Sequence, residues 1–209
     1  GRFLNEDESA MNFATPEALD ALTFFKRLHD DGLVPPSVWM GSENPQELFL
    51  AGLVASHIGG SWVINKYASE VEDFEWAAVR MPQRRIRSSV AGGKFIASFK
   101  GAANEEAAVD LLLHFSEPEQ NAKYCRDTFN LTARNDIEID YPRRSDDFAR
   151  MAADLAVTPA ITAEDWKSPE LNQIYSYIRE QIVEGLLDNI TMEEVAQNIH
   201  DRGNSFFEE

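Results

Sequence analysis

Two glycines stand directly before a tryptophan at Gly59-Gly60-Ser61-Trp62, where the apolar run ELFLAGLVASHI ends. Glycine leaves the backbone free and lets other groups approach it closely. A tryptophan buried in a core needs no such neighbours, whereas a ring held at the mouth of a ligand cleft can need them. An exposed ring of this kind stacks on flat apolar faces. The local pattern therefore leaves two interpretations of Trp62 open, a core residue and a ligand-stacking residue.

Other glycines and aromatic residues fit the same chemistry. Sugars offer a flat face of C–H groups and a rim of hydroxyls, so a sugar site needs an exposed ring with polar groups around it. Gly92-Gly93 interrupt an extended run, and Tyr175 and Tyr177 come early in a long helical pattern. These residues would suit a sugar cleft, but residues of these types, taken one by one, belong more often to a core than to a site.

No pattern of a catalytic or metal site accompanies these residues. The sequence has no G-x-S-x-G, H-E-x-x-H, P-loop or G-x-G-x-x-G motif, and its four histidines are scattered. His57 is predicted to be a satisfied core residue rather than a ligand. With 36 acidic residues, two carboxylates could always be chosen as a glycosidase acid and base, so their number carries no weight. We expect no enzymatic activity, no cofactor and no metal.

The composition argues against several partners. The formal charge is −17, which disfavours nucleic acid and anionic membranes, because both are bound chiefly through Lys and Arg. No apolar run approaches the roughly 18 to 20 residues that span a bilayer. The first residues, GRFLNEDESAMNF, lack the basic and apolar regions of a signal peptide. The single cysteine, Cys125, is predicted to be a small buried residue of a helix.

Local signals predict a helix-rich chain. One helix begins after Thr15, and capping boxes are predicted at Thr191 with Glu194 and at Ser116 with Glu119. The runs LVASHI, FEWAAVRMP and SVAGGKFIASF have the composition of strands. The result is an α/β chain with three or four short strands. Besides the three capped helices, others are expected over 45–51, 104–115, 145–156 and 168–189.

Four segments in order resemble one family. LFLAGLVASHIGGSWVI is similar to the pattern F-x-x-G-x-x-A-M-x-x-x-G-x-W of the extracellular solute-binding proteins of carbohydrate ABC transporters (bacterial family 1, the maltose-binding-protein-like group). VAGGKFIASFKGAANEEAAVDLLLHFSEPEQNAKYCRDTFNLTAR resembles the glycine pair, strand and helices that follow. The opening helix with GLVPP and the final helices around NITMEEVAQ fit as well. The resemblance implies a periplasmic-binding-protein-like (type II) lobe.

The chain departs from the family pattern in length and in detail. Ala55-Ser56 stands where the pattern has Ala-Met, and LTAR replaces L-P-x-R. Family members are about twice as long and have two lobes, and this sequence resembles only the C-terminal half. The resemblance implies that residues 1–89 and 136–209 build the second lobe. Residues 90–135 would normally complete the first lobe, so we expect them either to be rearranged or to self-associate with another copy.

The resemblance also implies a set of ligand contacts. Trp62 matches the tryptophan that stacks on the sugar, and Gly93 and Lys94 match the glycine-pair position whose backbone and following side chain reach the ligand. Tyr175 falls where the last long helix presents an aromatic ring to the cleft. Arg134 is either a ligand or hinge contact, or a surface ion pair. Trp39 is a loop aromatic close to the expected cleft.

These expectations combine into a function. The resemblance implies a non-catalytic substrate-binding component of an ABC importer that captures a sugar or oligosaccharide between two lobes and docks on membrane permease subunits. It also implies a place outside the cytoplasm, in the periplasm or anchored to lipid. A binding protein for another solute, such as a peptide, polyamine or metal, and an acidic helical interaction module are the alternatives.

Overall fold

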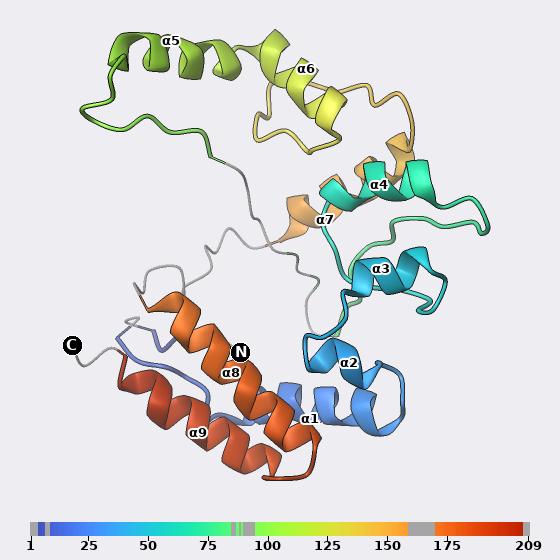
Figure 1. Ribbon diagram of the computed structural model, residues 1–209, viewed down its shortest axis with the longest axis vertical. Coiled ribbons are helices and arrows are strands. Elements are labelled where there is room, and N and C mark those ends of the chain that lie inside the picture. Colours follow the sequence, from blue (N-terminus) through green and yellow to red (C-terminus); the bar gives the residue numbers. More distant parts are fainter. Residues whose placement is uncertain are drawn as a thin grey trace. The chain divides into compact units, whose positions relative to one another are not determined.

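The computed structural model describes residues 4–6, 9–84, 87, 89, 95–158 and 170–206. The chain divides into two compact units, one made of Gly1–Pro45 with Ile161–Glu209 and the other of Gln46–Ala160. In the described residues both units are built from helices (Figure 1). None of these helices is long and apolar enough to cross a membrane.

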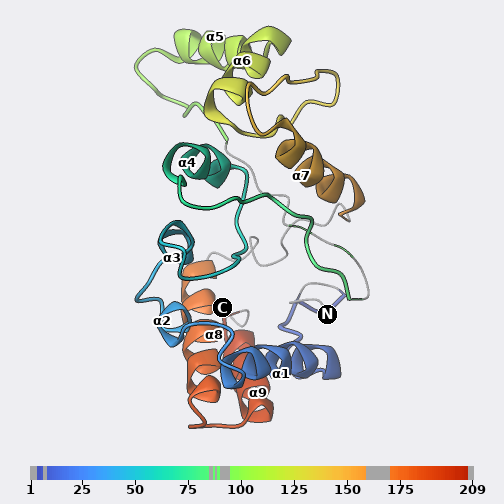
Figure 2. The ribbon, with the colours of Figure 1, turned by 90° about the vertical axis from the view of Figure 1, so that its right-hand side faces the viewer.

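The unit that holds both ends of the chain is a group of packed helices. α1 (Pro16–Asp30) and α2 (Pro36–Trp39) come from its first part, and α8 (Leu171–Leu186) and α9 (Met192–Asn204) from its last part. α8 and α9 lie side by side, and α1 packs against both (Figures 1 and 2). The core between them is aliphatic, and its most buried members include Leu4, Leu22, Ile174, Leu186, Val195 and Ile199.

The capping signals are confirmed at two of three helices. Thr15 caps α1 by accepting a hydrogen bond from the Ala18 amide at 3.3 Å. At α9, Thr191 and Glu194 form the complete capping box. The box predicted at Ser116 is wrong, because Ser116 is the last residue of α5 (Glu105–Ser116) and its hydroxyl donates to the Leu112 carbonyl at 2.7 Å. The next helix starts instead at Pro118, which is well suited to a first helical position.

The second unit contains α3 (Pro45–Leu50), α4 (Trp62–Glu70), α5, α6 (Pro118–Thr128) and α7 (Ser145–Val157). One part of its core is formed by Ile64, Phe129, Tyr141 and Phe148, and the rings of Tyr141 and Phe148 stack with centroids 3.8 Å apart. Cys125 is buried and free in α6, as predicted, and burial raises the pKa of its thiol.

The predicted strands at 53–58 and 74–82 are wrong within the described part of the chain, where both runs lack strand pairing. Residues 90–94 of the third run lie outside the described residues, and its residues 95–99 also lack strand pairing. An extended segment needs partners for its backbone N–H and C=O groups. For the backbones of Ala78 and Met81 these partners are side chains of α7 instead of a neighbouring strand.

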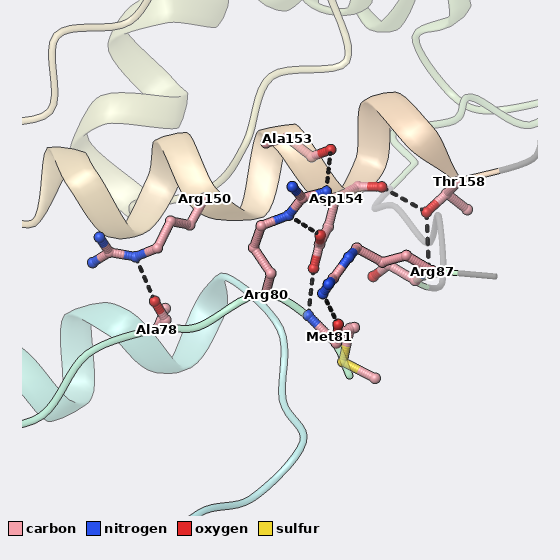
Figure 3. A network of polar contacts seen from close by, with 9 residues as sticks. Ala78, Arg80, Met81, Arg87, Arg150, Ala153, Asp154 and Thr158 are labelled. Atoms are coloured by element: carbon pink, nitrogen blue, oxygen red, sulfur yellow. Dashed lines mark hydrogen bonds and ion pairs between the residues drawn. The ribbon is translucent and has the colours of Figure 1, made fainter. Parts of the chain in front are cut away.

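The contacts along α7 show how this replacement works. The Asp154 carboxylate accepts hydrogen bonds from the Met81 amide at 2.5 Å and from Nε of Arg80 at 2.6 Å (Figure 3). Nε of Arg150 donates to the Ala78 carbonyl at 2.6 Å, and the Thr158 hydroxyl accepts from the Ser89 amide at 2.9 Å. The extended segment is therefore fixed along one helix by polar side chains.

Candidate functional site

Trp62 lies on the surface, at the first residue of α4. Its side chain is 60% exposed, whereas Val63, Ile64 and Tyr67 of the same helix are buried. The helix is thus anchored by three apolar side chains while the indole stays outside. The interpretation of Trp62 as a core residue is excluded by this exposure, and a ring available for stacking remains.

Gly60 is required by the position of this ring. A Cβ atom placed on Gly60 would lie 1.9 Å from the Cζ3 atom of Trp62 and 2.3 Å from its Cη2 atom. Distances this short do not occur in folded proteins, so any larger residue at position 60 would displace the indole. The backbone of Gly60 is not in the left-handed region. Its role here is close approach to the indole, not an unusual backbone angle.

The ring cluster beneath α4 supports the same region. Phe49 lies 5.0 Å from Tyr67 and 5.6 Å from Phe74, measured between ring centroids, and Trp76 contacts Tyr67 edge-on at 5.6 Å. The guanidinium carbon of Arg144 lies 3.6 Å from the centroid of the Trp76 ring. These contacts are typical of a rigid aromatic cluster.

Arg134 takes part in an ion pair in the structure. Its Nε and Nη2 atoms donate to the two Asp136 oxygens at 2.8 and 2.5 Å, and Nη1 donates to the Ser116 carbonyl at 2.7 Å. The hydrogen bond from Arg134 is the main cause that lowers the pKa of Asp136. All three groups of the guanidinium have partners, which favours the surface ion-pair interpretation over a ligand contact.

Gly93 and Lys94 fall outside the described residues, and Tyr175 belongs to the other unit, where it is partly exposed on α8. Trp39 packs edge-on against Phe25 with centroids 5.6 Å apart and borders the core of that unit. The structure thus places Trp62 and Tyr175 on the surfaces of separate units.

A second surface feature lies one turn beyond Tyr175. A cavity of about 350 Å³ is lined on α8 by Ser176, Arg179, Glu180, Val183 and Glu184, with Met40 on its other side. The Arg179 guanidinium has no hydrogen bond or ion pair within the described part of the chain. An aromatic residue and an unpaired cation four residues apart share one helix face. Arg179 was not predicted as a site residue, although its spacing from Tyr175 can be read from the sequence.

Similarity to known proteins decides the family. Residues 3–153 match the sequence profile described as bacterial extracellular solute-binding protein. The chain belongs to this family. Members of the family bind solutes outside the cytoplasm, and the expectation drawn from the four ordered segments is confirmed.

Curated relatives of this solute-binding chain are binding proteins of Brucella. That of Brucella abortus (strain 2308) is 25% identical over 154 residues, which cover 72% of this chain and 37% of the relative. A binding protein of Brucella suis biovar 1 matches equally well. The chain therefore spans little more than a third of the length of these relatives.

Solved structures of solute-binding proteins share the fold. An ABC substrate-binding protein of Listeria monocytogenes in complex with cycloalternan superposes with a TM-score of 0.76 at 20% identity, over 98% of this chain and 53% of that one. The sugar-binding protein MalE of Xanthomonas citri superposes with a TM-score of 0.74 at 17% identity, over 99% of this chain and 53% of MalE. The α/β type II fold class is confirmed, and the chain corresponds to about half of it.

Proposed function

We propose that the chain belongs to the substrate-binding component of an ABC importer, that it captures a sugar or oligosaccharide, and that it catalyses no reaction. The observation that carries this proposal is the surface position of Trp62, whose indole packs on Gly60 and leaves most of the side chain exposed. The solute-binding family and the sugar ligands of several solved relatives support it.

The proposed mechanism is capture by stacking. The Trp62 ring covers the apolar face of a sugar, and hydrogen bonds hold the hydroxyl rim. Gly93, Lys94 and Tyr175 are the other contacts proposed from the family resemblance, whereas the ion pair of Arg134 argues against a ligand contact there. In a two-lobe protein, hinge closure then buries the solute, and the closed form docks on the permease subunits outside the cytoplasm. Residues 1–89 and 136–209 are proposed as the second lobe and 90–135 as a part of the first.

A titration with sugars tests this proposal. We expect mono- and oligosaccharides from a panel to cause a saturable change in the tryptophan fluorescence of the full-length protein. Trp62→Ala should weaken binding by about 30-fold, since a central tryptophan contributes about 2 kcal/mol or more to an interface. The 209-residue chain by itself should bind weakly, because the proposed cleft needs both lobes.

The matched control is Ser61→Ala, because the Ser61 side chain makes no capping hydrogen bond. This variant should bind sugar like the parent. Micromolar binding by the 209-residue chain would contradict the need for two lobes. An absence of any response to sugars, with Trp62→Ala only less stable, would point to another solute such as a peptide or polyamine.

We also propose that the 209-residue chain self-associates through exposed apolar side chains of residues 95–113. Phe95 and Phe99 are 85% and 80% exposed, and Val109, Leu111 and Leu113 of α5 are exposed as well. Large exposed apolar areas favour association. Sedimentation velocity should show a dimer whose population rises with concentration and falls in Phe95→Ser/Phe99→Ser. A sharp monomer boundary at high concentration would contradict this proposal.

A further inference from the structure

A half-buried hydrogen bond lies close to the glycine turn that precedes Trp62. Nε2 of His57 and the hydroxyl of Tyr67 are 2.5 Å apart, and Nδ1 of His57 is 3.1 Å from the Ile58 carbonyl oxygen. A carbonyl can only accept, so Nδ1 carries the proton. In the neutral ring Nε2 is then the acceptor, and the Tyr67 hydroxyl donates to it.

Tyr67 is a fixed donor for this bond. Its side chain is 3% exposed on the buried face of α4. Burial, together with the charge of Glu47, raises its pKa to about 12, so the hydroxyl keeps its proton at any physiological pH. The rings of Phe49 and Tyr67 both lie 5.5 Å from the imidazole, measured between centroids. The imidazole is thus held both by a hydrogen bond and by packing.

The imidazole fills the space beside the glycine turn. A Cβ atom on Gly59 would lie 2.8 Å from Cε1 of His57, so the ring occupies the place that a side chain at position 59 would take. The next residue, Gly60, in turn lies against the Trp62 indole. Tyr67, His57, the two glycines and Trp62 are therefore close neighbours in this order.

The indole receives little other support. Trp62 is mostly exposed, and the first turn of α4 is held by backbone bonds from the Val63 amide to the Gly60 carbonyl at 3.2 Å and from the Ile64 amide to the Ser61 carbonyl at 3.1 Å. The Gly60 carbonyl belongs to the glycine turn, and the Ser61 carbonyl belongs to the residue that follows the turn. The orientation of the ring therefore depends on the position of this turn.

We infer that His57 and Tyr67 are positioning residues, which hold the Gly59-Gly60 turn so that the Trp62 ring faces the ligand. The expected effect on sugar binding rests on the proposed function. The expected effect on the position of the Trp62 ring does not. Pre-organisation of a stacking ring lowers the cost of ordering it when a ligand binds.

Tyr67→Phe tests the inference, because it removes one hydroxyl and keeps the ring contacts. The indole N–H resonance of Trp62, assigned with Trp62→Phe, is followed in the ligand-free protein. We expect this resonance to shift and broaden in Tyr67→Phe, and sugar affinity to fall about fivefold, which corresponds to one ordinary hydrogen bond. His57→Gln, which keeps an acceptor for the hydroxyl, should disturb the resonance less than His57→Ala.

Tyr124→Phe is the matched control, since Tyr124 is a partly exposed tyrosine of α6 in the same unit. It should leave the Trp62 resonance unchanged. An unchanged resonance in Tyr67→Phe, even with lower thermal stability, would overturn the inference. A shifted resonance in a protein that binds no sugar would support the positioning role and contradict the proposed function.

Discussion

Asp154→Asn is expected to lower the free energy of unfolding of the Gln46–Ala160 unit by about 3 kcal/mol. Asp154 is 4% exposed, and its carboxylate binds both the Met81 amide and Arg80. Breaking a buried ion pair typically costs about 3–5 kcal/mol, and the lower end applies because the Arg80 side chain is 40% exposed and can be hydrated. The carboxylate of the parent accepts hydrogen bonds from the Met81 amide and from Arg80. In the variant, the side-chain N–H₂ group would instead face one of these donors.

Asp147 repeats this arrangement two helical turns earlier, since a turn has 3.6 residues. It is buried, accepts a hydrogen bond from the Ala78 amide at 2.8 Å, and pairs with Arg150 and Arg144. The neighbouring Asp146 is exposed and makes the matched control. Urea unfolding should show a loss for Asp154→Asn and a change of less than about 0.5 kcal/mol for Asp146→Asn. Equal midpoints for the two variants would show that α7 does not fix the extended segment.

The effect of Asp154→Asn should depend on pH. Burial by itself raises the pKa of Asp154, but the bonds from Arg80 and Met81 outweigh burial and leave the pKa below its usual value of 3.8. The carboxylate therefore stabilises the folded state above the ordinary pKa, and this contribution is lost as the pH falls through the lowered value. The difference between parent and variant should shrink toward zero in acid.

The helices with capping signals were predictable from sequence, and the extended runs were not. Thr15 and the pair Thr191 and Glu194 act locally, so their patterns determine where α1 and α9 begin. A strand instead depends on a partner that local sequence does not name. In FEWAAVRMP the backbone partners are Asp147 and Asp154, about seventy residues later. Composition alone could not distinguish this arrangement from a sheet.

A candidate site could be proposed from the sequence, but its geometry could not. The order of glycines and tryptophan identified Trp62, but its exposure depends on how α4 packs through Ile64 and Tyr67. α4 itself was missed, because its nine residues directly follow a run with strand composition and carry no side-chain cap. The function of Gly60 is close approach to the indole, which only the spatial structure reveals. Arg179 was missed because nothing in the local pattern shows whether its guanidinium has a partner among the described residues.

Gly185→Val should destabilise the unit that contains α8 and α9 by about 3 kcal/mol, at the upper end of the range for an overpacked core. A Cβ atom on Gly185 would lie 2.6 Å from Cγ2 of Val195 and 3.0 Å from Cε of Met192. Val195 is fully buried, so it has no free space into which it could move. The two helices can approach so closely only because position 185 has no side chain.

A double-mutant cycle separates this clash from the general cost of valine in a helix. Val195→Ala removes the methyl group that the new side chain would meet, so Gly185→Val/Val195→Ala should be more stable than the sum of the two single changes predicts, by about 0.5–3 kcal/mol. Asn172→Val adds the same side chain at an exposed position of α8 and should change stability by less than about 0.5 kcal/mol. Additive effects in the cycle would show that α8 and α9 shift apart to accept the valine. Because α8 also carries Tyr175, such a shift would weaken sugar binding in the proposed function, whereas Asn172→Val would not.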